Sequence, residues 1–474
     1  MTVQASTDGF DGGLGSVPSN PNGTDHACAR LPPVRAAGQM LVLIAITTLS
    51  WSAVQVHGIP LGDVFLLPGG FLLVISSTRT KVHLPPLILA GFAVVALAGI
   101  ATAFSPPGSS YLFSRFTLST ELQQSLGYAV RSTGNLSSLG KYELALFVLP
   151  VIVVLAGASS RAFVQRAAVA WILGILVSIA AAYTDYLHLT HFSVSLIGYN
   201  PISNRQPGLS AQANNIGVQA AMSAPLLLTV FLRASIRARC FAVVAVAGSA
   251  LGIYISGSRG SAVGILLGVL VTLVVVRQTR IWTARIMVGV VVGGIYLFLT
   301  TGGSRILDVL RLSNNQSATQ SDAGRSMLRA QGIKDFYHSP LHGIGWGFSN
   351  QAHLIYIQLL AAGGVVGFAG VALVVLGVLG PGWRIRSDPL AGALIAATVT
   401  WLLIGLVENQ LTDQWIYVPL ALLAALIGQE RLNMLARRKA APMKPGNVRP
   451  QDSKRNSASV GRAQPVVLAK PARL

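Results

Sequence analysis

Long apolar runs separated by polar connections fill the chain between residues 39 and 428. A helix needs about 20 mostly apolar residues to span the hydrocarbon core of a bilayer, so runs of this length predict transmembrane helices. Twelve runs meet or approach that length: 39–56, 60–77, 84–104, 141–158, 163–184, 213–232, 240–257, 261–276, 286–301, 352–379, 390–407 and 415–428. The pattern therefore predicts an all-α, polytopic integral membrane protein with about twelve transmembrane helices.

The polar connections differ in length. Three long ones cover about 105–140, 185–212 and 302–351, and alternating helices place all three on one side of the membrane. Loops longer than about 15 residues in a compact protein are more often functional than connective. We therefore expect the working face on the side of these loops, with 302–351 as its largest loop.

Charge assigns the two sides. Only 11% of residues are charged and 52% are hydrophobic, whereas soluble domains carry about a quarter charged residues. The net charge of +20 resides mainly in the short connections and the C-terminal segment. The positive-inside rule then places both termini in the cytoplasm and the long loops outside the cytoplasmic membrane. No basic motif interleaved with aromatic residues suggests nucleic-acid binding, whereas a basic tail attracts anionic lipids.

Three parts follow from these patterns. Residues 1–38 are rich in Gly, Ser, Pro and Asn and predict a disordered cytoplasmic tail, without the features of a removable signal peptide. Residues 39–428 form the transmembrane domain, and residues 429–474 a basic, disordered cytoplasmic tail. The two cysteines, Cys28 and Cys240, both fall on the cytoplasmic side and suggest neither a disulfide nor a metal site.

Arg259 is the only charged residue between Cys240 and Val276. A helix over these roughly 37 residues would be about 55 Å long, far beyond a bilayer, so the run must fold back on itself. Ser256-Gly257-Ser258-Arg259-Gly260 supplies turn residues and places Arg259 at the outer end of two helices. A charge at membrane level tends to be functional, and a guanidinium suits a phosphate. The alternative for arginines on this face is an ion pair with Asp308 or Asp322.

The stretch 324–370 holds the candidate chemistry. Its first part, 324–337, has apolar spacing compatible with a helix along the membrane surface, and HSPLHGIGWG is a turn region. His353 begins a long apolar run and is a candidate general base at the membrane boundary. Competing histidines on the same face are His188, His191, His338 and His342. The glycines that follow, Gly363, Gly364 and Gly367, permit close helix packing.

Four segments in order resemble the O-antigen ligase/polymerase superfamily of membrane glycosyltransferases, over a core of 205–370. They are RQPGLSAQANNIGVQAA (205–221), ISGSRGSAVG (255–264), GRSMLRAQGIKDFYHSPLHGIGWG (324–347) and HLIYIQLLAAGGVVG (353–367). Leu354 stands where the family usually has Asn or Ser after the histidine, so the partner of the histidine stays open.

The resemblance implies a donor glycan on undecaprenyl diphosphate in the outer leaflet and an acceptor hydroxyl, without a nucleotide sugar, metal or cofactor. It implies that Arg259 and Arg325 bind the diphosphate, with Arg205 as a further contact. His353 would deprotonate or orient the acceptor, and Glu408 would orient His353. Polymerases, which extend the glycan, and ligases, which pass it to another acceptor, share these motifs.

A secondary transporter or a flippase for lipid-linked glycans is the alternative. Such proteins generally need acidic residues or broken helices near the membrane midplane. The predicted spans are almost free of Asp and Glu, which favours the enzyme. A non-catalytic scaffold would leave the outer arginines and the long loops without a role.

Overall fold

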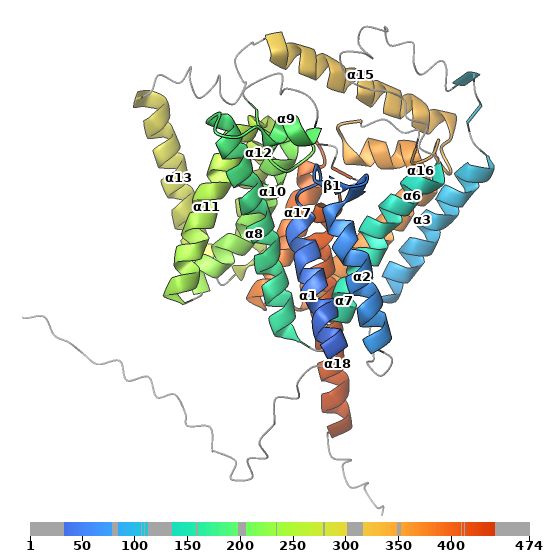
Figure 1. Ribbon diagram of the computed structural model, residues 1–474, viewed down its shortest axis with the longest axis horizontal. Helices are drawn as coiled ribbons and strands as arrows, with labels where there is room; N and C mark the ends of the chain where they lie inside the picture. Colours follow the sequence, from blue (N-terminus) through green and yellow to red (C-terminus); the bar gives the residue numbers. More distant parts are fainter. Residues whose placement is uncertain are drawn as a thin grey trace, which may run out of the picture. The chain divides into compact units, whose positions relative to one another are not determined.

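The computed structural model describes residues 33–77, 84–105, 107–108, 110–111, 135–157, 160–197, 205–233, 235–277, 280–300, 316–347, 352–408, 410–411 and 413–440. These residues are almost entirely helical (Figure 1). Their α-helices are α1 (Pro33–Thr48), α2 (Leu61–Ser76), α3 (Pro86–Phe104), α6 (Asn135–Glu143), α7 (Leu149–Gly157), α8 (Arg161–Tyr186), α9 (Phe192–Ile197), α10 (Ala213–Arg233), α11 (Ile236–Ser256), α12 (Arg259–Val275), α13 (Arg280–Thr300), α15 (Gln316–His338), α16 (Ile355–Arg384), α17 (Pro389–Ile404) and α18 (Val418–Ala440). A π-helical turn, η1 (Leu144–Val148), joins α6 to α7, and a 3-10 turn, η3 (Gln414–Tyr417), precedes α18.

Each of the twelve apolar runs contains a helix. Within the described residues, six helical segments are long and apolar enough to cross a membrane: Pro86–Phe104, Ser138–Gly157, Arg161–Tyr186, Ile236–Ser256, Ile355–Arg384 and Gln414–Arg437. Four shorter apolar helices are α1, α2, α12 and α17. The all-α class is therefore confirmed for a multi-pass membrane protein, whereas the number of about twelve spans and their orientation stay predictions.

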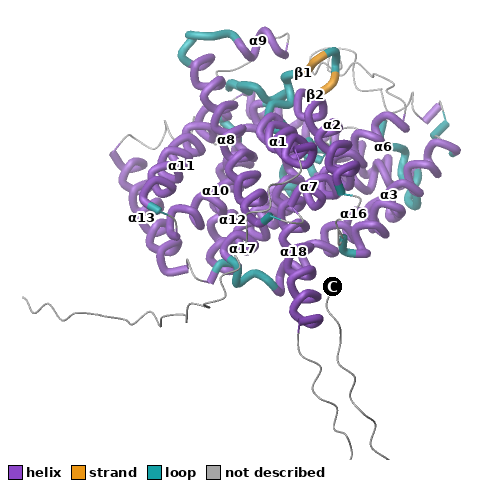
Figure 2. Tube along the Cα trace, turned by 60° about the horizontal axis from the view of Figure 1, so that its bottom comes forward, coloured by secondary structure: helices purple, strands orange, loops and turns teal. Residues whose placement is uncertain are grey.

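Two predicted boundaries near the N-terminus differ from the structure. The first helix begins at Pro33, inside the predicted tail, because proline is favoured at the first helical position. It ends at Thr48, where the predicted span continues to residue 56. The chain turns there into a hairpin of β1 (Gln55–Val56) and β2 (Ile59–Pro60), which lies beside α2 (Figure 2). His57 and Gly58 both have positive φ, as a two-residue hairpin turn requires.

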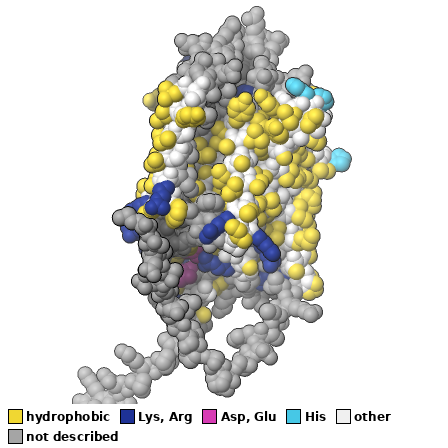
Figure 3. Space-filling model, turned by 90° about the vertical axis from the view of Figure 1, so that its left-hand side faces the viewer, with side chains coloured by type: hydrophobic (Ala, Val, Ile, Leu, Met, Phe, Trp, Pro, Cys, Tyr) yellow, Lys and Arg dark blue, Asp and Glu magenta, His cyan; other side chains and the backbone are white. Residues whose placement is uncertain are grey.

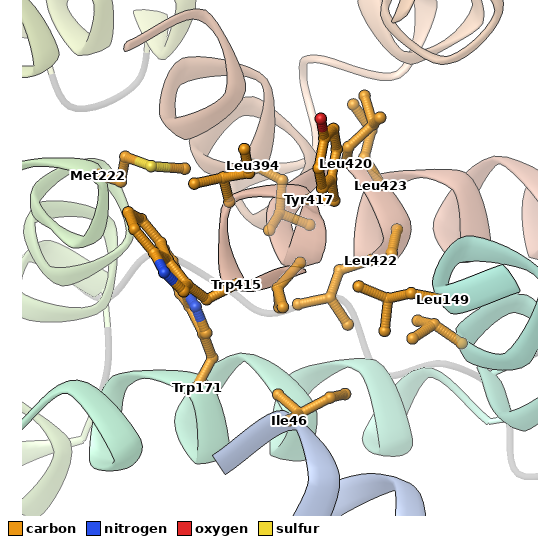
Figure 4. Close-up of a cluster of buried hydrophobic side chains, with 14 of the residues drawn as sticks. Ile46, Leu149, Trp171, Met222, Leu394, Trp415, Tyr417, Leu420, Leu422 and Leu423 are labelled. Carbon is orange, nitrogen blue, oxygen red and sulfur yellow. The ribbon is translucent and has the colours of Figure 1, made fainter. Parts of the chain in front are cut away.

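The core lies where α8, α10, α17, η3 and α18 meet. Trp171, Met222, Leu394 and Trp415 come from four of these elements and face one another (Figure 4). All four side chains are fully buried. Because these residues are far apart in the sequence, their burial ties the chain into one compact unit, Met1–Gln429. The second unit, Glu430–Leu474, is described only over the end of α18, so helix continues into part of the predicted disordered tail.

Large apolar side chains also lie on the outside. Exposed examples on α3, α12 and α16 are Leu97, Phe104, Val274 and Leu376. On the face in Figure 3, hydrophobic side chains cover much of the surface, and Lys and Arg gather in its lower part. Apolar surface of this extent on helix after helix suits contact with lipid rather than water.

The helices that carry the predicted site residues pack against one another. The helices α11 and α12 both pack against α10, and α12 also packs on α17. The helix α15 packs on α16 and runs across the ends of other helices (Figure 1). The predicted helix 324–337 thus exists and extends over Gln316–His338.

Candidate functional site

The turn between α11 and α12 lies where the sequence predicts it. Gly257 has φ +53° and ends α11, a left-handed conformation that glycine adopts without strain. The Ser258 hydroxyl caps α12 by accepting a hydrogen bond from the Ser261 amide at 3.3 Å. Arg259 is the first residue of α12. The apolar run 240–276 is therefore a helical hairpin with Arg259 at its turn.

The Arg259 guanidinium forms an ion pair with α15. Its Nη2 lies 2.6 Å from Asp322 Oδ1, and the two side chains are 29% and 52% exposed. Of the two aspartates proposed as alternative partners, Asp322 thus takes that role, and Asp308 lies outside the described residues. An exposed ion pair contributes only about 0–1 kcal/mol, so an anionic ligand can replace the carboxylate at small cost.

Arg205 is fixed on the other side of the same turn. Its Nε donates to the Ser256 carbonyl at 2.5 Å, and its Nη2 donates to Asn214 Oδ1. Asn214 in turn donates from Nδ2 to Glu408 Oε2 at 3.1 Å. Arg205 therefore belongs to a continuous polar network that joins α10, the turn and the segment after α17.

Glu408 is the buried carboxyl group of this network, with no exposed surface. The Ser258 hydroxyl donates to its Oε1 at 3.4 Å, and a Cβ on Gly260 would lie 2.5 Å from the same oxygen. Burial raises the pKa of Glu408, while the charge of Arg325 and the hydrogen bond from Gln410 offset part of that effect. The carboxylate thus holds the start of α12 in place, which requires glycine at position 260.

His353 precedes α16 in a left-handed conformation, with φ +49°. Burial, together with the positive charges of Arg325 and Arg329, lowers the pKa of its imidazole to about 4. The imidazole is therefore neutral at pH 7 and able to accept a proton. Its Nδ1 is buried and has no hydrogen-bond partner among the described residues.

Glu408, which the resemblance implies as the residue that orients His353, bonds to other side chains among the described residues. Asn214 and Ser258 occupy the Glu408 oxygens. The two segments are nevertheless joined, because the Ile355 amide donates to the Gly405 carbonyl at 2.9 Å. Glu408 and His353 are also linked through Arg325, whose charge acts on both.

The position of α15 explains why its arginines act on His353. Arg325 and Arg329 are four residues apart and share one face of the helix. Gly332 packs on the start of α16, where a Cβ would lie 2.8 Å from Ile357 Cγ2. Leu328, between the arginines, is buried. The structure thus places four predicted site residues at one end of α10, α12, α16 and α17, and the fifth, Arg325, on α15, which runs across the ends of other helices.

A comparison with protein families matches part of this region to a known family. The O-antigen ligase family model matches residues 241–372. The chain contains an O-antigen ligase domain. The match confirms the resemblance and indicates an O-antigen ligase- or polymerase-like membrane enzyme, a class that works with a lipid-linked glycan donor and a glycan acceptor. No curated protein matches the sequence.

The O-antigen ligase domain contains Arg259, Arg325 and His353, whereas Arg205 and Glu408 lie outside the matched residues. Arg205 and Glu408 nevertheless both contact the turn before Arg259. The candidate site is therefore completed by two segments outside the matched residues, one before α10 and one after α17.

The domain also holds a feature that sequence analysis missed. The long helix α16 is broken at Gly364, which has φ +62° and ψ −164°. The loop after α15 fills the break: the Ile344 and Gly345 amides donate to the Ala361 and Ala362 carbonyls at 2.8 and 3.0 Å. In return, the Val365 and Val366 amides donate to the carbonyls of Pro340 and Leu341.

This close backbone approach explains the glycines on both sides. A Cβ on Gly364 would lie 2.3 Å from the Leu341 backbone, and one on Gly343 would lie 2.4 Å from the backbone of Ala362. The glycines were expected to permit close helix packing, but at Gly364 the close neighbour is the backbone of a loop. The break ties the HSPLHGIGWG loop, and with it the end of α15, to α16.

Proposed function

We propose that the chain is a membrane glycosyltransferase that transfers a glycan from undecaprenyl diphosphate to an acceptor hydroxyl on the extracytoplasmic face of the cytoplasmic membrane. The observation that carries the proposal is a half-buried His353, whose pKa is lowered by burial and by the positive charge of Arg325, inside the residues that match the O-antigen ligase family. In this proposal neither a metal nor a nucleotide sugar takes part.

The proposed reaction needs a base and a cationic clamp. His353 takes the proton of the acceptor hydroxyl as its oxygen attacks the anomeric carbon of the donor. The bond from that carbon to the phosphate oxygen breaks, and the electron pair leaves with the undecaprenyl diphosphate. Arg259 and Arg325 stabilise the negative charge that grows on the leaving group.

Arg259 has to exchange partners in this scheme. Its Nη2 bonds to Asp322, and in the proposal the diphosphate takes the place of that carboxylate. The Asp322 carboxylate is more than half exposed, so water can solvate it once released. The same helix then presents Arg325, one turn further along, to the donor.

Arg205 and Glu408 have positioning roles in the proposal. Glu408 accepts from Asn214 and from Ser258, and Arg205 donates to Asn214 and to the Ser256 carbonyl. Together they hold both sides of the turn that carries Arg259. Arg205 also supplies positive charge near the proposed diphosphate site. Glu408 therefore acts through the turn rather than on the histidine.

One observation favours the transporter or flippase. Glu143 lies in the candidate span Ser138–Gly157, and both its carboxylate oxygens are buried without a partner among the described residues. The broken helix α16 does not add to that case. In transporters the free backbone groups of a broken helix bind substrate or ions, whereas loop 340–345 already bonds those of α16.

The test is to incubate the purified full chain with an undecaprenyl-diphosphate oligosaccharide and candidate acceptors, and to measure product masses. Chain extension identifies a polymerase, and transfer to another acceptor identifies a ligase. A parallel measurement follows the donor across the bilayer of proteoliposomes that contain the chain. Donor movement with no new glycosidic bond would contradict the proposal and support the transporter.

A further inference from the structure

A pocket lies at the end of α12 opposite Arg259. It has a volume of about 360 Å³ and is lined by Val275, Val276, Arg277, Arg384, Arg386 and Ser387. Small-molecule sites in proteins run from about 300 to 1,000 Å³, so the pocket has room for a small ligand. Its walls come from the end of α12, the end of α16 and the turn that leads into α17.

Three arginines surround this space with no opposite charge among them. Neither ion pair formed by the described residues, Arg161 with Asp388 and Arg259 with Asp322, involves a pocket arginine. Asp388, the nearest carboxylate in sequence, lies 2.5 Å from Arg161 and accepts a hydrogen bond from the Leu390 amide at 2.9 Å. The residues that line the pocket therefore carry positive charge only.

One of these guanidinium groups is held in position. Arg386 Nη1 donates to the Trp383 carbonyl at 2.8 Å, and the guanidinium carbon lies 4.8 Å from the Trp383 ring centroid. A cation fixed in this way has lost part of its freedom before a ligand arrives, which favours binding. The side chain is half-buried, whereas Arg277 and Arg384 are exposed.

The positive-inside rule accounts for positive charge at this end of the helices, but it does not require that three guanidinium groups line one concavity. Planar guanidinium groups match phosphate oxygens, and Val275 and Val276 add an apolar wall. We propose that the pocket binds a phosphate group, carried either by an anionic lipid headgroup or by a soluble phosphate ester.

This site is distinct from the proposed diphosphate clamp. The 17 residues of α12 separate the two ends by about 25 Å at 1.5 Å per residue. One diphosphate cannot contact both Arg259 and the pocket. The inference therefore goes beyond the proposed glycan transfer and stands or falls independently of it.

The experiment compares the full chain with a pocket variant, R277Q/R384Q/R386Q. The control, R166Q/R237Q/R239Q, removes the same positive charge from exposed arginines on α8 and α11, outside the pocket. Each protein is extracted from vesicles of phosphatidylcholine and phosphatidylglycerol, and the retained lipid is counted by native mass spectrometry. In a second arm, titration calorimetry measures the binding of inorganic phosphate and glycerol phosphate.

We expect the pocket variant to lose at least fivefold in retained phosphatidylglycerol or in affinity for the soluble phosphates, and the control to match the wild type. The arm that responds identifies the carrier of the phosphate. Ser387→Trp fills the pocket without changing its charge and is expected to lose the same binding, which covers the case that the triple variant does not fold. Equal losses in the pocket variant and the control, or no loss in either pocket variant, would overturn the proposal.

Discussion

Arg205 and Arg259 stand on two sides of one turn and are held in opposite ways. Arg205 donates to Asn214 and to a backbone carbonyl, in a network that ends on the fully buried Glu408. Arg259 meets a single carboxylate, Asp322, which is 52% exposed. Breaking a buried network costs several times more than breaking an exposed pair. The candidate site therefore combines a buried hydrogen-bond network around Glu408 with one exposed ion pair to α15, which a ligand can replace.

Replacing His353 gives the largest expected effect. His353→Asn keeps a residue that tolerates positive φ and removes the base. We expect the transfer rate to fall about 10²–10⁴-fold, with unchanged thermal unfolding. The matched control is His191→Ala, an exposed histidine in the described chain that should keep wild-type rate. A His353→Asn protein with wild-type turnover would contradict the role of the histidine.

The next variant tests the side of the site that α15 forms. Arg325→Gln removes a charge that acts on both His353 and Glu408, and we expect about a 10²-fold lower rate because the leaving group loses one donor. Lys334→Gln changes an exposed charge on the same helix and serves as the control. Equal transfer rates for the two variants would contradict a specific role for Arg325.

The hydrogen-bond network around Glu408 is tested through the free energy of unfolding. Glu408→Gln keeps the shape of the side chain but faces the Asn214 amide and the Ser258 hydroxyl with a weaker acceptor. We expect the free energy of unfolding to fall by about 1–3 kcal/mol, measured by denaturant titration in detergent. Glu430→Gln, outside the network, should change it little. If the Glu408 variant is as stable as the wild type, this network does not stabilise the fold.

The smallest expected effect comes from breaking the exposed ion pair between Arg259 and Asp322. Asp322→Asn removes the carboxylate that competes for Arg259. We expect the KM for the lipid-linked donor to fall by no more than about fivefold, which corresponds to the roughly 1 kcal/mol upper value of an exposed ion pair. A rise in KM would show instead that Asp322 supports the bound donor.

Local features of this fold could be predicted from the sequence. Apolar run lengths located every membrane-level helix that the structure describes, because hydropathy and helix length are properties of neighbouring residues. The fold-back at Ser256–Arg259 was predictable for the same reason, since one helix cannot be that long. Arg259 was a candidate because of its isolated charge at the fold-back and His353 because it begins a long apolar run, whereas the role of Arg325 came from motif order.

Long-range pairing could not be predicted. The bond between Asn214 and Glu408 joins residues 194 positions apart, and nothing in the local pattern identifies the partner. The same holds for the break at Gly364, where two backbone segments exchange hydrogen bonds. The sequence shows a glycine-rich helix and a glycine-rich loop, but only the folded structure shows that the loop bonds to the backbone of the helix at its break.

The central claim, a neutral histidine that serves as base beneath the arginines of α15, is tested most directly by the rate of glycan transfer as a function of pH. Burial, Arg325 and Arg329 lower the pKa of His353 to about 4, so the active, neutral form persists from pH 8 down to about 5 and is lost as the pH falls through 4. We expect the rate to follow that course, with the midpoint moving upward in Arg329→Gln because one positive charge is gone. A midpoint near 6.5, the ordinary value for histidine, that is the same in both proteins would contradict the claim.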